Sequence, residues 1–578
     1  MMSGRSLSLL ALLLVLVAAG SCRGTSDEPQ EILLTRELVT IGDDQVGLSM
    51  LGQVFPQAWV SEPVKLRGDY TLEFFPIVRG TDESAHFRVL VRMGRIDQDI
   101  AFVEATRESE ISQSVSHLAS PVEIDLAPFR GKTIEVIFFL EAPAGDRKGV
   151  VGLPRLRPRS TDVEDRSHDV LMICTDTLRW DTSIGEAGGR LMPVLHSLPG
   201  DVVTYTRAFS AASWTMPSIT TALTGLYPRY HGTGERTYSE STDPPPGHFT
   251  FETGLGKPTF LSSYPSELES LAEKLLEAGY STRLVAGNPL YFPSGLARDG
   301  FEIAVHAKVL RGPVISRHAK DLIMSADPER PLFLLVHYMD PHEWGRLFSR
   351  RFGPRSRPID NREGARQAYE EVVMRSDQAL GVLLGDWGRH RGGDPLIVFW
   401  SDHGEHLSEE RLFGHGNSMK ETLLKVPLVI SYPPGLLGRA AEADRPISLA
   451  DLTPTVLDAV GVDYDPSSLS GKSLLRSAVS GARYHFADYQ LYSRELASVR
   501  RGDHKLVIDL DSGQTKLWQV TRDGHETRVE DAEIERELYD AYQDYRAAAL
   551  EARQHLSPPE DVDQEEALEA LRALGYVE

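Results

Sequence analysis

The first part of the chain alternates hydrophobic and polar residues, whereas the middle part contains continuous apolar runs. Residues 86–92 and 133–138 follow a period of two, which is typical of strands with one buried and one solvated face. Gly and Pro punctuate these segments, and no long helical pattern interrupts them. The pattern predicts a β-sandwich over residues 31–158.

Continuous apolar runs occupy residues 169–175, 331–337 and 395–400. Such runs are typical of parallel strands that are buried on both faces. Between them, leucines in residues 266–279 are spaced as on a helix, and Gly279 suits its C-terminal cap. Strands alternating with helices predict an α/β domain over residues 166–483, with its chemistry beyond the carboxyl ends of the strands.

The last part of the chain, residues 484–578, returns to short strands and then becomes helical. Residues 503–508 have strand character, and the end of the chain is rich in Glu, Ala and Leu. We predict a small C-terminal β subdomain followed by an acidic helical tail. The charges of the tail are interpreted as a solvated helix face.

The N-terminus is predicted to direct export. Arg5 precedes an apolar stretch, residues 7–18, that is too short to span a bilayer. Ala19-Gly20-Ser21-Cys22 resembles a bacterial lipobox, so residues 1–22 are predicted to be a lipoprotein signal and Cys22 the lipidated residue. An ordinary secretory signal remains an alternative. Lipidation implies a protein of the cell envelope, anchored on the periplasmic or extracellular face of a bacterial membrane.

Length and charge narrow the classes of function. A chain of 578 residues is too long for one compact core. The formal net charge of -23 argues against a nucleic-acid partner, which needs clustered Lys and Arg. A small anionic ester remains a candidate substrate, because one metal ion can reverse the local field. Of the two cysteines, Cys174 lies in an apolar run and is interpreted as a buried strand residue.

Two predicted strands end in residues that bind metals. Asp176 follows the run 169–175, and Asp402 and His403 follow the run 395–400. An isolated Asp after a strand is often a turn residue or a helix cap, but a charge next to a buried run must be paired or bind a cation. The two carboxylates and the imidazole form a set of oxygen and nitrogen ligands. The set predicts one divalent cation, with Zn or Mn favoured and Ca also compatible.

The segment from Trp214 to Pro228 resembles the nucleophile loop of sulfatases in the alkaline phosphatase superfamily. It reads WTMPSITTALTGLYP, and the sulfatase pattern is Cys or Ser-x-Pro-x-Arg followed by a helix and Thr-Gly-x-Tyr-Pro. The resemblance implies an alkaline-phosphatase-like three-layer α/β/α sandwich with a small C-terminal β subdomain. Sulfatases oxidise the first residue of this pattern to formylglycine. Thr215 stands at that position and cannot be converted, and the resemblance implies that its hydroxyl is the nucleophile and joins Asp176, Asp402 and His403 as a ligand of the cation.

Two histidines are further candidates for the site. His342 resembles the Pro-His segment of sulfatases, and His415 lies in the ordered set of motifs that follows Asp402 and His403. The resemblance implies that both contact the ester group, and either one is a candidate general acid for the leaving group. His337 and Arg179 are assigned to packing or to support of the site.

The chain departs from the sulfatase pattern at several sites. Ile219 replaces the arginine of the nucleophile loop, Thr177 replaces a second metal-binding aspartate, and Val285-Ala286-Gly287-Asn288-Pro289 replaces the expected Gly-Lys-Trp-His segment. Two cationic groups of the sulfate pocket of the family are therefore missing from this chain. Asp340 is followed four positions on by Trp344 where two-metal relatives carry His, so one metal is expected.

Three classes of function follow from these observations. The leading hypothesis is a metal-dependent hydrolase or transferase that acts on phosphate monoesters or diesters through a threonine nucleophile, on a small anionic, glycan or lipid substrate. A sulfuric ester hydrolase that works without formylglycine is the second. A non-catalytic glycan-binding protein on the same fold is the third. The residues indicate neither the substrate alcohol nor the oligomeric state.

Overall fold

The computed structural model describes residues 32–574 apart from short gaps. The gaps are residues 34–37, 43–45, 67–68, 81–83, 114–120, 142–146, 159–167, 239–243, 252–258, 292–294, 297–299, 308–310, 438–442, 477–482, 493, 555, 557–561 and 563. The predicted export segment, including Cys22, lies outside the described residues. Within the described residues, no helix combines the length and apolar character needed to cross a membrane.

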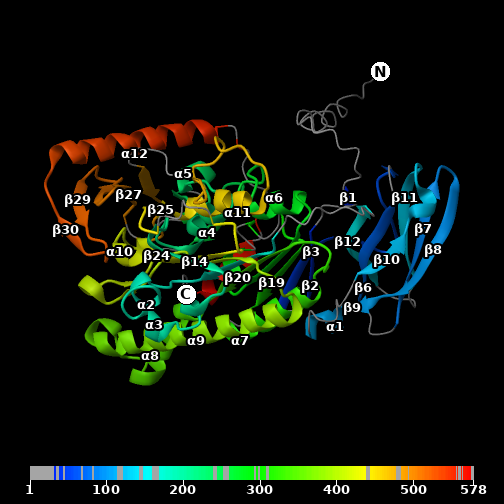
Figure 1. Ribbon diagram of the computed structural model, residues 1–578, viewed down its shortest axis with the longest axis horizontal. Helices are drawn as coiled ribbons and strands as arrows, with labels where there is room; N and C mark the ends of the chain where they lie inside the picture. The colour runs from blue at the N-terminus through cyan, green and yellow to red at the C-terminus, as the bar shows by residue number, and fades with distance from the viewer. Residues whose placement is uncertain are drawn as a thin grey trace, which may run out of the picture.

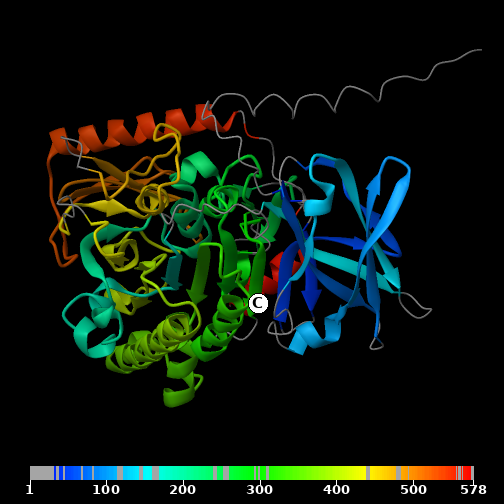
Figure 2. The ribbon, with the colours of Figure 1, turned by 45° about the vertical axis from the view of Figure 1, so that its right-hand side comes forward.

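The N-terminal part consists of two sheets that pack face to face (Figures 1 and 2). The first contains β10 (Val122–Asp125), β6 (Tyr70–Arg79), β12 (Lys148–Pro158) and β3 (Val46–Phe55), with β1 (Ile32–Leu33), β2 (Leu38–Gly42) and β9 (Thr106–Arg107) beside them. The second contains β4 (Ala58–Val60), β11 (Thr133–Glu141), β7 (His86–Met93) and β8 (Ile96–Glu104), with β5 (Val64–Lys65) beside β11. Helix α1 (Glu108–Gln113) follows β9. Phe74, Phe87 and Phe138 fill the space between the sheets.

Strand β3 joins the sandwich to the central sheet. One part of β3 pairs with β12, and another part pairs with β19 (Ile303–Ala307), a strand of the central sheet. A buried ion-pair cluster crosses the same junction: Arg155 lies 2.6 Å from Glu73 of the sandwich and 2.9 Å from Glu302, which precedes β19. The sandwich and the central sheet therefore share one continuous hydrogen-bonded sheet.

The central sheet has the order β19, β18 (Ser281–Ala286), β20 (Leu332–Tyr338), β13 (Val170–Thr175), β21 (Leu396–Trp400), β24 (Lys425–Tyr432), β14 (Asp201–Phe209) and β25 (Ile447–Ser448). The strands from β19 to β21 are parallel, and β24 runs antiparallel to its neighbours. Successive residues of β13 enter opposite cores, with Leu171 on one face and Met172 on the other. This burial on both faces explains the continuous apolar runs of the sequence.

Helices cover both faces of the central sheet, as Figure 1 shows. One face packs against α3 (Gly188–Leu191), α7 (Gly312–Met324), α8 (Trp344–Phe352) and α9 (Arg362–His390). The other face packs against α4 (Thr215–Thr224), α6 (Leu271–Glu277) and α11 (Leu452–Val460). The predicted three-layer α/β/α fold class is confirmed. The helix expected over residues 266–279 begins later, at α6, because Ser270 and Glu273 form a capping box there.

The C-terminal part begins with the antiparallel sheet β26 (Tyr484–Ala487), β27 (Leu496–Arg501), β28 (His504–Asp509), β29 (Thr515–Val520) and β30 (Glu526–Arg528). Helix α12 (Ala532–Arg553) packs against this sheet, and α13 (Gln564–Ala573) follows. Smaller elements lie around the central sheet: α2 (Trp180–Ser183), α5 (Pro228–His231), β15 (Arg236–Tyr238), β16 (His248–Phe251), β17 (Thr259–Ser262), β22 (His406–Leu407), β23 (Phe413–Gly414) and α10 (Glu421–Leu424).

Candidate metal centre and active site

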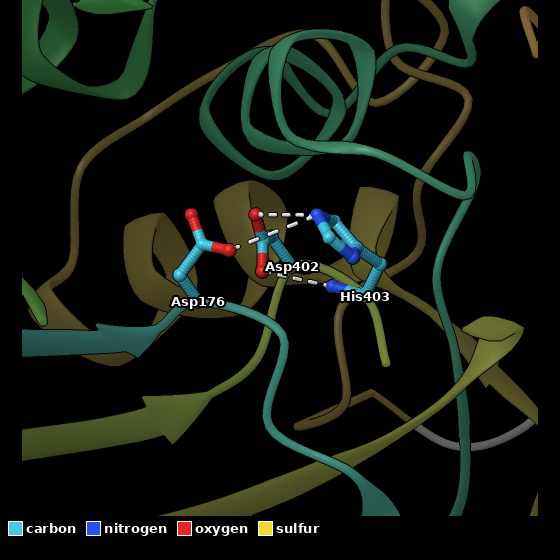
Figure 3. Close-up of side chains that lie close together, drawn as sticks. All are labelled: Asp176, Asp402 and His403. Atoms are coloured by element: carbon cyan, nitrogen blue, oxygen red, sulfur yellow. Dashed lines mark hydrogen bonds and ion pairs between the residues drawn. The ribbon is translucent and has the colours of Figure 1, made fainter. Parts of the chain in front are cut away.

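Two neighbouring strands end in the residues that the sequence predicts as metal ligands. β13 leads directly into Asp176, and β21 leads into Asp402 and His403 through Ser401. The two strands pair in parallel, so their carboxyl ends meet at one edge of the sheet. Figure 3 shows the two carboxylates and the imidazole close together. All three side chains are fully buried.

The backbone holds one polar atom of Asp402 and one of His403. Asp402 Oδ1 accepts hydrogen bonds from the backbone N–H groups of His403, at 2.9 Å, and Thr177, at 3.2 Å. His403 Nδ1 lies 2.9 Å from the carbonyl oxygen of Gly404. Because a carbonyl only accepts, Nδ1 donates, and Nε2 of the neutral ring carries a lone pair. Asp402 Oδ2 and His403 Nε2 therefore face the site.

Asp176 follows the same pattern with side-chain partners. Its Oδ2 accepts a hydrogen bond of 2.9 Å from Nδ2 of Asn288 and lies 3.4 Å from Nε2 of His337. Asp176 Oδ1 and Asp402 Oδ2 are buried and accept no hydrogen bond within the described residues. Because a buried charge is costly unless it is paired or bound to a cation, these two oxygens fit a metal ion.

The three atoms that face the site are spaced as metal ligands are. His403 Nε2 lies 3.3 Å from Asp402 Oδ2 and 3.9 Å from Asp176 Oδ1. Ligand atoms of the three residues all lie within 4.8 Å of one another, and theirs is the one such His, Cys, Asp or Glu group in the described part of the chain. Two carboxylates with one imidazole suit Zn or Mn, and Ca is a poorer match because it prefers oxygen ligands.

The electrostatics of the site also fit a cation. Burial and the charge of Asp176 raise the pKa of Asp402 well above its ordinary value. Burial opposes ionisation of Asp176 too, but the hydrogen bond from His337 and the nearby charge of His342 lower its pKa. Burial lowers the pKa of His403 to about 3 and keeps its ring neutral. Without a cation the two carboxyls disfavour each other's charge, and a divalent ion would allow both to ionise.

Helix α4 places the hydroxyl of Thr215 beside the three ligands. Trp214 is extended, and Thr215 is the first helical residue. Thr215 Oγ1 lies 3.3 Å from His403 Nε2, 3.4 Å from Asp176 Oδ2 and 3.4 Å from Asn288 Nδ2. The first backbone N–H groups of a helix have no partner within the helix and favour an anion. The hydroxyl therefore lies where a cation and an anionic ester would meet.

His342 and His415 lie together at this site, but their surroundings shift the pKa values of the two rings in opposite directions. Their ring centres lie 5.3 Å apart, and His415 lies 4.6 Å from His403. His415 Nδ1 lies 2.9 Å from Oε2 of Glu405. Burial favours a neutral ring at His415, but the Glu405 carboxylate outweighs it and raises the pKa of His415. At His342 burial dominates and lowers the pKa, so His415 is the better proton donor.

Asn288 and His337 are site residues that the sequence analysis did not select. The backbone N–H of Leu290 donates to Asn288 Oδ1 at 3.0 Å, which turns Nδ2 toward Asp176 and Thr215. His337 sits inside the buried strand β20, and its Nδ1 lies 3.1 Å from the hydroxyl of Tyr291. The sequence did offer one signal for His337, because a histidine inside an otherwise apolar predicted strand indicates a polar partner in its surroundings. Asn288 carried a weaker signal, as a replacement for an expected cationic segment.

The other departures from the sulfatase pattern take no part in the ligand set. Thr177 Oγ1 donates to the backbone oxygen of Asp176 at 2.7 Å and so is engaged with the backbone. Ile219 is buried in the core between α4 and the sheet. Asp340 Oδ1 accepts a hydrogen bond of 3.2 Å from the backbone N–H of Gly312. Arg179 forms ion pairs with Asp181 and Glu409, away from the ligands.

The fold and this site define an α/β protein of the alkaline-phosphatase type with a candidate centre for one divalent cation. A solved structure of a putative sulfatase from Bacteroides thetaiotaomicron VPI-5482 has this fold, with a TM-score of 0.52 and 16% identity over 69% of this chain and 96% of that one. The sequence pattern of the family named Sulfatase matches residues 168–305 and 314–462. This central region of the chain belongs to the sulfatase family.

Two curated relatives resemble parts of the chain. Human N-sulphoglucosamine sulphohydrolase is 25% identical over 368 residues, which is 56% of this chain and 65% of that protein. The multifunctional alkaline phosphatase superfamily protein PehA of Trinickia caryophylli is 30% identical over 157 residues, which is 26% of this chain and 29% of that protein. The chain thus covers less than two thirds of the length of either relative.

Proposed function

We propose that the protein is a metal-dependent hydrolase or transferase that cleaves phosphate monoesters or diesters with Thr215 as the nucleophile. The observation that carries the proposal is the position of Thr215 Oγ1, 3.3 Å from His403 Nε2 and 3.4 Å from Asp176 Oδ2. A formylglycine expels sulfate through its second hydroxyl, and threonine has none. A phosphothreonine can instead be cleared by water or by an acceptor alcohol.

Asp176, Asp402, His403 and Thr215 would hold the cation, for which Zn or Mn is favoured and Ca is the remaining candidate. When bound, a divalent ion supplies positive charge that lowers the pKa of a coordinated hydroxyl and offsets charge on the ester. One N–H of Asn288 Nδ2 donates to Asp176 Oδ2, and the other, which points to the Thr215 oxygen in the free site, would donate to an ester oxygen when the ester is bound. This set of roles accounts for the two buried carboxylate oxygens, Asp176 Oδ1 and Asp402 Oδ2, that accept no hydrogen bond within the described residues.

The reaction follows from these roles in two steps. The deprotonated Thr215 oxygen forms a bond to phosphorus, the bond from phosphorus to the leaving oxygen breaks, and His415 gives that oxygen a proton. The Glu405 carboxylate, 2.9 Å from His415 Nδ1, supports the charged form of the imidazole. In the second step water or an alcohol gives its proton to His415 and attacks phosphorus, the bond from phosphorus to the Thr215 oxygen breaks, and that oxygen leaves in the deprotonated form in which the first step began. His342, whose burial favours the neutral ring, is assigned to hydrogen bonding with the ester.

A sulfuric ester hydrolase without formylglycine is the second candidate, and the family of the central region favours it. In this alternative the same metal centre would bind a sulfate ester, and Thr215 would have to release sulfate by direct attack of water. The arginine of the family's nucleophile loop is Ile219 here, and no cationic side chain of the Gly-Lys-Trp-His kind follows β18. These two substitutions favour the phosphate ester.

The cellular location is also part of the proposal. Residues 7–18 and the segment ending at Cys22 support an exported, lipid-anchored protein of the bacterial cell envelope. Its substrate would then be a glycan, a lipid or a small ester outside the cytoplasm. Metabolic labelling with a fatty acid checks the anchor, which should be labelled in the full chain and unlabelled after Cys22→Ser.

The experiment that tests the reaction compares aryl phosphate, aryl phosphodiester and aryl sulfate, with added Zn, Mn or Ca and after removal of metal. We expect metal-dependent turnover of a phosphate ester that Thr215→Ala abolishes and Thr215→Ser retains in part. Mass spectrometry of acid-quenched enzyme should find one phosphoryl group on the peptide that contains Thr215. Turnover of the sulfate alone would establish the second candidate.

A further inference from the structure

The second helix of the C-terminal tail packs beside the candidate site. Helix α12 lies along the C-terminal sheet, whereas α13 lies near the centre of the molecule in both ribbon views (Figures 1 and 2). There α13 packs against β16 and against the short turn Pro289–Tyr291 that follows Asn288. The tail thus returns from its own subdomain to the catalytic domain.

Helix α13 has one buried face. Ala567, Ala570 and Leu571 are buried on it, and Gln564, Glu565, Glu569 and Arg572 are exposed. The side chain of Gln564 also joins α13 to β16, since Oε1 accepts from the backbone N–H of Thr250 at 3.1 Å and Nε2 donates to the backbone oxygen of His248 at 2.7 Å. Glu565 and Glu569 do face solvent, but the helix that carries them is docked.

The apolar residues that α13 covers form a cluster distinct from the two cores of the central sheet, which we name the tail cluster. Its members are Ala212, Trp214, Met216, Phe249, Phe251, Leu261, Leu290, Met339, Leu491, Val562, Ala567, Ala570, Leu571 and Leu574. Three of the five segments of the catalytic domain that contribute to it end at, or lead into, the candidate site, and Leu491 of the C-terminal part adds a fourth connection.

Three of these connections are direct. Trp214 and Met216 are the neighbours of Thr215 in the chain. The backbone N–H of Leu290 holds the side-chain oxygen of Asn288 at 3.0 Å. The loop of His342 is anchored in the same way, because the backbone N–H of His342 donates to the carbonyl oxygen of Met339 at 3.1 Å.

The loop of His415 is connected through hydrogen bonds of the backbone. The N–H groups of Leu491 and Tyr492 donate to the carbonyl oxygen of Gly416 at 3.0 and 2.8 Å. The N–H of Gly416 donates in turn to Ser213 at 2.8 Å, beside the nucleophile loop. The four loops that carry Thr215, Asn288, His342 and His415 thus meet around one small cluster.

We propose that α13 is a positioning element of the active site. Its buried side chain Leu571 packs in the tail cluster and thereby holds the loops that carry Thr215 and Asn288 in place. The effect on turnover rests on the proposed function, whereas the effect on loop order does not. Three of the four candidate metal ligands, Asp176, Asp402 and His403, follow β13 and β21, which lie within the two cores of the central sheet. Loss of the contact of α13 therefore reduces turnover while the metal remains bound.

The test uses full-length Leu571→Ala, with Arg572→Ala on the exposed side of the same helix as the matched control and Leu571→Met as the conservative variant. We expect kcat to fall about tenfold to a hundredfold in Leu571→Ala, as for a small misplacement of reacting groups. Leu571→Met should restore most of the loss, and Arg572→Ala should change nothing. Metal affinity should equal that of the unmodified protein in all three.

Hydrogen exchange gives a readout that does not depend on a substrate. In Leu571→Ala, exchange should rise in residues 212–216 and 288–291, and residues 170–175 and 396–400 should keep their protection. Faster exchange confined to α13 and β16, with kcat unchanged, would overturn the proposal. If the unmodified protein turns over no phosphate or sulfate ester, the proposed function fails, and the exchange pattern still decides whether α13 orders the loops.

Discussion

The candidate metal ligands and the groups around the ester belong to two differently built halves of one site. Asp176, Asp402 and His403 extend from adjacent parallel strands whose side chains are buried on both faces. Thr215 and Asn288 instead lie where a helix begins and in a loop, and both are backed by the small tail cluster. The first half draws its rigidity from the central sheet, and the second draws it from packing between segments far apart in the sequence.

Because of this difference, binding of the cation and catalytic turnover depend on different parts of the structure. Strand ends fix the ligand atoms with backbone hydrogen bonds, such as those from His403 and Thr177 to Asp402 Oδ1. The Thr215 hydroxyl and the Asn288 amide depend on contacts with the tail. Substitutions in the first half should therefore remove the metal and activity together, whereas substitutions at Asn288 and in the tail cluster should remove activity alone.

Asp402→Asn is expected to have the largest effect. The amide preserves the shape of the side chain but takes away a ligand charge, so bound metal and turnover should be lost together. Added metal should raise Tm of the unmodified protein, since a ligand at a hundred times its Kd contributes about 2.7 kcal/mol. That increase should vanish in the variant, as calorimetry with and without Zn or Mn can measure.

The same variant makes a second prediction without metal. Because burial and Asp176 raise the pKa of Asp402, the charged form of its carboxyl is electrostatically unfavourable in the metal-free site. Metal-free Asp402→Asn should thus unfold at a temperature equal to or above that of the metal-free unmodified protein. A marked destabilisation would show that Asp402 supports the fold without a cation.

Asn288→Ala tests the second half of the site. Loss of one oriented donor at a developing anion typically lowers kcat by about 10²–10³-fold, and metal affinity should be unchanged. Asn288→Asp is the isosteric comparison, because it replaces a donor to Asp176 Oδ2 and Thr215 Oγ1 with a third carboxylate. It should be at least as damaging to kcat. Loss of metal in Asn288→Ala would contradict the view that the second half of the site acts in turnover and not in metal binding.

The two loop histidines should differ in the size of their effect. His415→Gln is expected to lower kcat by about 10²-fold, as for a general acid, because Glu405 supports its charged form. His342→Gln should lower kcat by about tenfold, because the loss of one hydrogen bond to the ester, about 1–1.5 kcal/mol, corresponds to roughly that factor in rate. Both are measured as kcat with aryl phosphates of different leaving-group pKa. Only the His415→Gln variant should become more sensitive to the leaving group.

The sequence predicted the first half of the site well because its signals are local. A charged residue directly after a continuous apolar run identifies the end of a buried strand, and this holds for Asp176 and Asp402 alike. The α/β fold class follows from the same runs. The motif around Thr215 and His415 added the second half only through resemblance to a family.

Contacts between distant segments were not predictable in this way. Asn288 follows β18 but meets Asp176, 112 positions away in the chain. Helix α13 reads as an acidic amphipathic helix in the sequence, and its buried face gives no indication of which loops it covers. The sandwich likewise reads as a module of its own, although β3 pairs with β19 of the central sheet. Such pairings depend on the path of the whole chain.

Asp340 gives the smallest expected effect and the most selective check on the number of metals. It follows β20 as Asp176 follows β13, but within the described residues it lies outside the metal-binding group. Burial raises its pKa to about 6, whereas the pKa of an unfolded Asp is about 3.9. The native state therefore holds the Asp340 proton more tightly, and its contribution to stability is present below about pH 4 and lost as pH rises through 6.

Asp340→Asn should remove this pH dependence. The side-chain oxygen can still accept from Gly312, so the variant should gain stability over the unmodified protein as pH rises from 4 to 7. The gain is on the order of 1–3 kcal/mol, measured as the free energy of unfolding in urea, and the exposed Asp394→Asn should show none. Metal content should stay at one ion with kcat nearly unchanged. If the unmodified protein held two ions and Asp340→Asn lost one, a third strand end would bind metal. The first half of the site would then comprise the ends of β13, β21 and β20.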